Sequence, residues 1–135
     1  MIRKLGALWG FLFLFGGILA FVPGVTKDGM YFGVFMVNTA HNILHAASGA
    51  LFLLAAMLGA KPSRLWFLLF GALYVTLALI GFVVGDGLIF GLIMNSPFDS
   101  WGHAFLGVLL LLIGFATPKS PAERKTYVPA ETARG

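Results

Sequence analysis

The chain has 135 residues, of which 59% are hydrophobic, 10% are charged and 18 are glycine. A water-soluble domain of ordinary composition carries about 25% charged residues, because its surface must be hydrated. The small number of charges therefore excludes a soluble enzyme, a disordered chain and a coiled coil. Because cysteine is absent, a disulfide scaffold, thiol catalysis and thiolate-bound metal or iron–sulfur sites are excluded as well.

The charged residues fall into short segments that leave four long apolar runs between them. Each run is close to the roughly 20 residues that cross a hydrocarbon core as a helix. The runs are continuous rather than alternating, and four strands cannot close a barrel, so membrane strands are excluded. We predict an all-α integral membrane four-helix bundle within residues 1–118 and a disordered cytoplasmic tail at 119–135. The predicted helices cover residues 5–25, 40–60, 65–84 and 101–117.

Lysine and arginine are distributed unequally between the two ends of the predicted helices. Eight basic residues lie in the amino end, the loop between the second and third runs, and the tail. The opposite side holds only Lys27, beside Asp28, Asp86 and Asp99. Basic loops remain in the cytoplasm, so we expect both termini there. The basic residues are then a topology signal and do not indicate nucleic acid as a partner. The expected partner is the lipid bilayer, with a homo-oligomer or a membrane-protein partner left open.

The first run also has features of a secretory signal peptide, because Arg3 and Lys4 precede it and small residues lie near Ala20. It is long for the apolar region of such a peptide, and the internal repeat described next requires it. We therefore expect the first run to remain as a helix.

Two segments on the acidic side resemble each other. Residues 28–36 read DGMYFGVFM and residues 86–94 read DGLIFGLIM, and the same spacing aligns His45 with His103. A parallel repeat of this kind brings the starts of the second and fourth helices to the same depth near the outer face. We therefore predict two parallel-repeated helical hairpins, at about residues 5–60 and 65–117.

The apolar segments 29–37 and 87–97 are too short to cross a membrane. We expect them to be amphipathic or half-inserted pieces on the outer leaflet.

Polar side chains gather on one face of the second helix and one face of the fourth. At 100° per residue, each set lies within about 120° of arc. His41 with His45, and Asp99 with His103, are spaced i, i+4 and so lie one turn apart. The predicted polar cluster consists of Asn38, His41, Asn42, His45, Asp99 and His103.

Four interpretations of this cluster remain open. In the first, its members form hydrogen bonds between helices, each contributing about 0.6–2 kcal/mol, and Asp99 equally caps the fourth helix. In the second, they bind Zn²⁺ or Fe²⁺ through the imidazoles and carboxylate of His41, His45, Asp99 and His103. In the third, His45 and His103 hold a haem. In the fourth, the histidines conduct protons or a solute.

Catalysis has little support, since no Ser-His-Asp order stands out and glutamate occurs only in the tail. The leading hypothesis is a non-enzymatic membrane protein without a cofactor, in which the His/Asp cluster joins helices 2 and 4 near the outer face. The alternative is a metal- or haem-binding membrane protein that uses the same cluster.

Residues 32–45, FGVFMVNTAHNILH, followed by Gly49, resemble the signature of a bacterial four-helix membrane family catalogued as domain of unknown function 4383. The family's second signature, an Asp-Asn-Trp-Leu-His block, is similar to DSWGH at residues 99–103. The likeness covers roughly residues 5–117 and departs from the family pattern at Met36, Thr39 and Gly102. It implies a multi-pass protein of the bacterial plasma (inner) membrane and brings no established activity.

Overall fold

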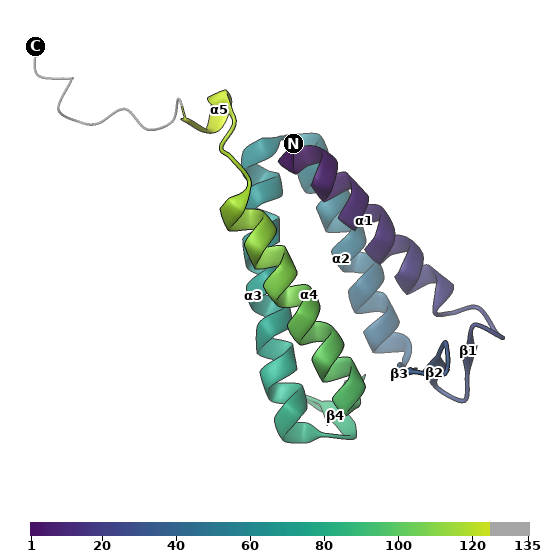
Figure 1. The fold of residues 1–135 in the computed structure, drawn as a ribbon. Helices are drawn as coiled ribbons and strands as arrows, with labels where there is room; N and C mark the ends of the chain where they lie inside the picture. Colours follow the sequence, from purple (N-terminus) through teal and green to yellow (C-terminus); the bar gives the residue numbers. More distant parts are fainter. Residues whose placement is uncertain (125–135) are drawn as a thin grey trace, which may run out of the picture.

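The computed structural model describes residues 1–124, which form four long helices (Figure 1). They are α1 (Ile2–Leu19), α2 (Thr39–Leu58), α3 (Ala60–Val84) and α4 (Pro97–Ala116). All four are long and apolar enough to cross a membrane. The predicted all-α fold of four membrane-length helices is confirmed, and the chain is a multi-pass membrane protein. The disorder predicted for the tail beyond residue 124 falls outside the described residues.

The ends of the helices depart from the apolar runs where local chemistry sets the boundary. α1 ends at Leu19 rather than near residue 25, and Pro23, which cannot continue a helix, follows soon after. α4 begins at Pro97 rather than at 101, because Ser96 caps it and proline suits a first helical turn.

The segments expected to be amphipathic or half-inserted pieces are antiparallel β-hairpins, the first of them extended to three strands. The first contains β1 (Thr26–Lys27), β2 (Met30–Tyr31) and β3 (Phe35–Met36), and the second contains β4 (Gly87–Ile89) and β5 (Ile93–Asn95). Asp28 and Gly29 join β1 to β2 with φ of 53° and 78°. An Asp-Gly pair with positive φ at both residues is favoured in two-residue hairpin turns. The strands of each hairpin form hydrogen bonds between their backbone N–H and C=O groups. The expected half-inserted segments would have left these groups without partners.

The helices pack tightly in two pairs, α1 with α2 and α3 with α4, whereas α1 and α4 lie apart (Figure 1). Glycine permits the close approach within each pair. A Cβ atom on Gly49 would lie 2.2 Å from the backbone nitrogen of Leu14, and one on Gly107 would lie 2.7 Å from that of Val75. Small residues at helix contacts allow this packing of backbone on backbone in membranes, where the hydrophobic effect does not drive helix association.

Aromatic side chains fill the space where the two pairs meet. The rings of Phe13, Phe52 and Tyr74 form one continuous stack with Phe67 and Phe70 from α3. This stack separates the polar residues near the hairpins from those at the other end of the bundle, where Ser63 is fully buried.

A short helix, α5 (Pro121–Arg124), lies at the opposite end of the bundle from the hairpins (Figure 1). The Arg64 guanidinium donates to the Glu123 carboxylate over 2.7 Å and also to the carbonyl of Gly114. The hydrogen bond from Arg64 is the main cause that lowers the pKa of the Glu123 carboxyl to about 2. The beginning of the tail is therefore attached to α3 and α4.

We predict that Gly49→Ala lowers the stability of the bundle by about 1–3 kcal/mol, because the added methyl group has no space against α1. Gly16→Ala is the control, since a Cβ there would have no neighbour nearer than 4.0 Å. Thermal unfolding in detergent, followed by circular dichroism, compares the two. Equal midpoints for both variants would contradict the close approach of α1 and α2.

Candidate functional site

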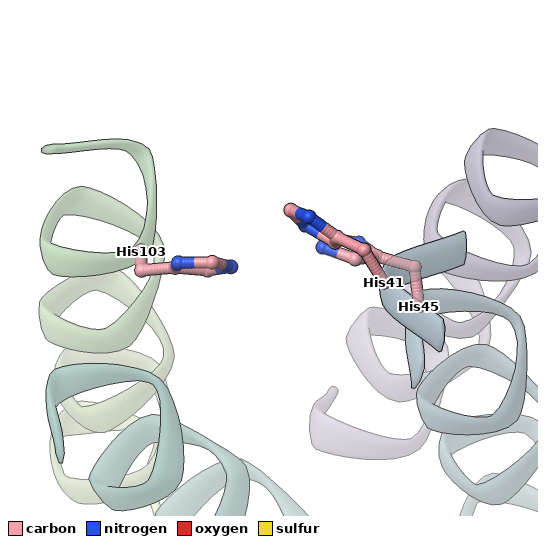
Figure 2. A group of neighbouring side chains, drawn as sticks. All are labelled: His41, His45 and His103. Atoms are coloured by element: carbon pink, nitrogen blue, oxygen red, sulfur yellow. The ribbon is translucent and has the colours of Figure 1, made fainter. Parts of the chain in front are cut away.

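Three imidazole rings converge between the two helix pairs, near the hairpins. His103 extends from α4 toward His41 and His45, which extend from α2 (Figure 2). The ring centroids lie 5.0 Å apart for His41 and His45, 5.5 Å for His41 and His103, and 6.1 Å for His45 and His103. Each ring offers one nitrogen, and these three atoms lie within 4.8 Å of one another. We call these three rings the imidazole cluster.

The hydrogen bonds of the imidazole cluster are uneven. His41 Nδ1 lies 3.0 Å from the carbonyl oxygen of Met94. A carbonyl only accepts, so Nδ1 carries the proton and the neutral ring keeps a lone pair on Nε2. The rings of His45 and His103 make no hydrogen bond with any described residue, and Nδ1 of His103 is fully buried. Buried polar groups almost always have partners, so Nδ1 of His103 requires an explanation, and the half-buried ring of His45 lies beside it.

Aromatic rings pack against the side of the cluster that faces the middle of the bundle. The ring of Phe13 lies 5.6 Å from that of His45, and the ring of Tyr74 lies 5.8 Å from His45 and 5.3 Å from His103. The Tyr74 hydroxyl is buried without a well-oriented hydrogen bond, and Ser48 is its polar neighbour. Helical periodicity shows the face of α3 on which Tyr74 lies and not what that face contacts, so the sequence alone does not place Tyr74 beside the histidines.

Polar side chains at the start of α2 and α4 bind the hairpin that belongs to the other helix pair. Asn38 donates to the carbonyl of Leu92 over 2.8 Å, and His41 bonds to Met94 in the same hairpin. In the opposite direction, the backbone N–H of Met36 donates to Asp99 Oδ2 over 3.0 Å. These hydrogen bonds connect the two helix pairs, between which the helices themselves make few contacts.

Asp99 also caps its own helix. Its Oδ2 accepts hydrogen bonds from the backbone nitrogen and the hydroxyl of Ser96 over 2.9 and 2.6 Å, and the Ser96 hydroxyl accepts from the Asp99 N–H. This reciprocal arrangement is a capping box. The carboxylate lies outside the group of nitrogens that converge. A metal-ligand role for Asp99 stays a prediction of the sequence alone.

The remaining polar residues close the outer ends of the helices. Asn42 donates to the carbonyl of Ala20 over 3.2 Å at the end of α1. The fully buried side chain of Asn95 donates to the carbonyls of Gly81 and Gly85, and Ser100 donates to it. The sequence assigned no role to Asn95, since only the fold shows that it lies beside the last turn of α3.

A cavity of about 270 Å³ adjoins the imidazole cluster. Its walls come from α1, α4 and the first hairpin, and α2 closes its back. Its lining includes Trp9, Phe13, Gly16, Tyr31, Phe35 and Gly102, together with His41, His45 and His103 of the imidazole cluster.

Four membrane-length helices that pack in pairs around buried imidazoles define a four-helix integral membrane protein. A family model described as Domain of unknown function (DUF4383) matches residues 3–116, and the chain belongs to that family. The family resemblance of the sequence is thereby confirmed, and it carries no activity. No curated protein and no solved structure matches the chain.

We predict that Asp99→Ala destabilises the protein by about 2–4 kcal/mol, because it removes a helix cap and the partner of the part-buried N–H of Met36. Asp86→Ala is the matched control, since Asp86 is an exposed carboxylate in the second outer segment that accepts no hydrogen bond. Denaturant titration in detergent measures both. If the two variants lose the same stability, Asp99 does not connect the pairs.

Proposed function

We propose that this protein binds one divalent first-row transition-metal ion through the imidazole cluster, within the membrane. One observation carries the proposal. Three imidazoles from two helices point toward one another, and two of them have no hydrogen-bond partner among the described residues. A metal ion is a partner that satisfies all three lone pairs together.

The spacing of the nitrogens supports coordination after a small adjustment. Tetrahedral Zn²⁺ with Zn–N bonds of 2.0–2.1 Å places its ligand nitrogens about 3.4 Å apart. The widest pair of the cluster would have to close by about 1.4 Å, since the three atoms lie within 4.8 Å. The bond from His41 Nδ1 to Met94 supports the proposal too, because metal-bound histidines usually donate their other N–H to a carbonyl or carboxylate.

The type of donor restricts the class of metal. Three neutral nitrogen ligands suit Zn²⁺, Cu²⁺, Fe²⁺ or Ni²⁺ and do not suit Mg²⁺ or Ca²⁺, which prefer oxygen. Three protein ligands leave one position open, as in metal sites that accept an exogenous ligand.

The other interpretations of the cluster fit this geometry less well. Haem requires a wide flat slot, but Phe13 and Tyr74 pack against the rings, and the cavity of about 270 Å³ is below the roughly 300–1,000 Å³ of drug-sized pockets. A purely structural role accounts for Asn38, His41 and Asp99, whose hydrogen bonds connect the helix pairs. It does not account for His45 and His103, which make no hydrogen bond with any described residue. Passage of protons or a solute lacks a path, because aromatic rings fill the described middle of the bundle.

The proposal predicts one equivalent of Zn²⁺ per chain after metal-stripped protein in mild detergent is reloaded. Either His45→Ala or His103→Ala is expected to weaken Zn²⁺ binding by at least about 100-fold, because each removes a metal ligand. Even the loss of a residue that only hydrogen-bonds to a ligand lowers metal affinity by about 10- to 100-fold. Calorimetric titration with elemental analysis provides the measurement.

Ser48→Ala is the matched control, since its hydroxyl lies on the same helix near the cluster but bonds only to the carbonyl of Leu44. His103→Phe keeps the volume of the ring, and so separates loss of a ligand from loss of folding. Wild-type protein that binds no stoichiometric metal, or a His103→Phe variant that binds it normally, would overturn the proposal.

We propose in addition that the bundle consists of two parallel-repeated hairpins, at about residues 5–60 and 65–117. The outer β-hairpins support this, because β2–β3 and β4–β5 pair in the same register at aligned positions. Phe32 and Gly33 have φ of 50° and 71°, and the aligned Phe90 and Gly91 have φ of 53° and 68°.

The connections between the pairs also support the repeat. His41 and Asp99 occupy aligned positions, and each bonds to the aligned methionine of the other copy, Met94 or Met36. Asn38 and Ser96 likewise cap α2 and α4 at aligned positions. Such an exchange is expected where two copies are related by an axis along the membrane normal.

We further propose that both termini lie in the cytoplasm and that the membrane is the bacterial plasma membrane. The start of α1, the turn between α2 and α3, and α5 lie together at one end of the bundle (Figure 1). This end holds Arg3, Lys4, Lys61, Arg64, Lys119 and Arg124, whereas the hairpin end has Lys27 as its basic residue within residues 1–124. The difference follows the positive-inside rule.

Reporter fusions test this orientation. Alkaline phosphatase fused after residue 62 or at the carboxyl end is expected to be inactive, and fluorescent-protein fusions at the same points are expected to fluoresce, because both points lie on the basic side. A phosphatase fusion at residue 86 should be active and is the positive control. Active phosphatase at residue 62 would contradict the orientation.

A further inference from the structure

The cavity beside the imidazole cluster is not enclosed on all sides. Tyr31, Phe35 and Val37 of the first outer segment cover it from the end of the bundle, and α2 closes its back. The remaining walls are α1 and α4, which make little contact with each other. Leu12, on the α1 wall, is 50% exposed. A molecule dissolved in the bilayer therefore reaches the cluster between α1 and α4 without passing through water.

The lining favours a neutral, flat molecule. It is made of aromatic rings, glycine and aliphatic side chains, and contains no lysine or arginine that would pair with a phosphate headgroup. Its one charged residue is Asp99, whose Oδ2 already accepts three hydrogen bonds.

Polar groups of the lining come from separate elements. His45 and His103, from α2 and α4, line the cavity with rings that make no hydrogen bond to any described residue. The Tyr31 phenol, from β2, also lines the cavity, and burial raises its pKa, so it stays a neutral hydrogen-bond donor. Polar groups from separate elements around one apolar, aromatic space suit a ring that carries an oxygen at each end.

We propose that this cavity binds the head of a membrane quinone, which enters between α1 and α4 while its hydrocarbon tail stays in the lipid. One carbonyl oxygen faces the imidazole cluster and the other faces Tyr31. The inference rests on the proposed function in one respect, since the inner carbonyl meets the open position of the metal site. A volume of about 270 Å³ accommodates a single substituted ring.

The test uses full-length protein in nanodiscs and decylubiquinone as the probe. Trp9 lines the cavity, so a bound quinone quenches its fluorescence in a saturable way. We expect saturation for the wild type and a much smaller quenching amplitude for Trp9→Phe, because Trp66 and Trp101 do not line this cavity.

Gly16→Leu is the decisive variant. A Cβ atom at Gly16 would meet nothing nearer than the Tyr31 hydroxyl at 4.0 Å, so leucine fits the helix and fills the cavity. We expect it to weaken decylubiquinone binding by at least about tenfold, or 1.4 kcal/mol. Ala72→Leu also introduces a leucine side chain, but on the exposed face of α3, and is expected to leave binding unchanged.

Quenching that rises linearly with the quinone content of the bilayer, or equal binding by Gly16→Leu and Ala72→Leu, would overturn the inference. Displacement of the quinone by decanol at equal concentration would also overturn it, because the site would then recognise only the tail.

The same samples are titrated with Zn²⁺. Metal binding without saturable quinone binding defeats this inference alone. Saturable binding that Gly16→Leu removes, in protein that binds no metal, defeats only the metal site.

Discussion

A polar group inside a bilayer has no water to bind, so the protein itself must satisfy it. Nearly all the polar side chains at the hairpin end of this bundle obey that constraint. Asn42 and Asn95 bind carbonyls at the ends of α1 and α3, and Asn38 and Asp99 bind backbone groups of the opposite hairpins. The rings of His45 and His103 are the contrast, because the same end leaves them without a partner. Because the bundle satisfies its other polar groups, we infer that these two rings bind a ligand that is not part of the chain.

The arrangement of the helices explains how such a site arises in a chain of 135 residues. Glycine lets each pair pack with backbone against backbone, which makes α1 with α2 and α3 with α4 two compact units. The units meet through an aromatic stack in the middle and through hydrogen bonds at the hairpins. The imidazole cluster and its cavity lie between these two contacts. The polar connections thus fix the distance between α2 and α4, on which any coordination depends.

Much of this fold could be predicted from the sequence, because apolar run length and basic-loop asymmetry depend on the bilayer and not on packing detail. The i, i+4 spacing also identified the faces of α2 and α4 that carry the histidines. The contacts across the pairs were out of reach. Helical periodicity cannot show that Met36 bonds to Asp99, that Tyr74 covers His103, or that a cavity opens between α1 and α4. The hairpins were missed for another reason: their apolar content masked the Asp-Gly turn signal at residue 28, which was present in the sequence.

The central claim is that the imidazole cluster is a metal site, and X-ray absorption at the zinc edge tests it most directly. Protein reloaded with one equivalent of Zn²⁺ in detergent should show a first shell at about 2.0–2.1 Å and the outer-shell scattering of three imidazoles. The same measurement on His103→Phe should lose one imidazole. A shell made only of oxygen atoms, or a spectrum that is the same for the wild type and His103→Phe, would contradict the account.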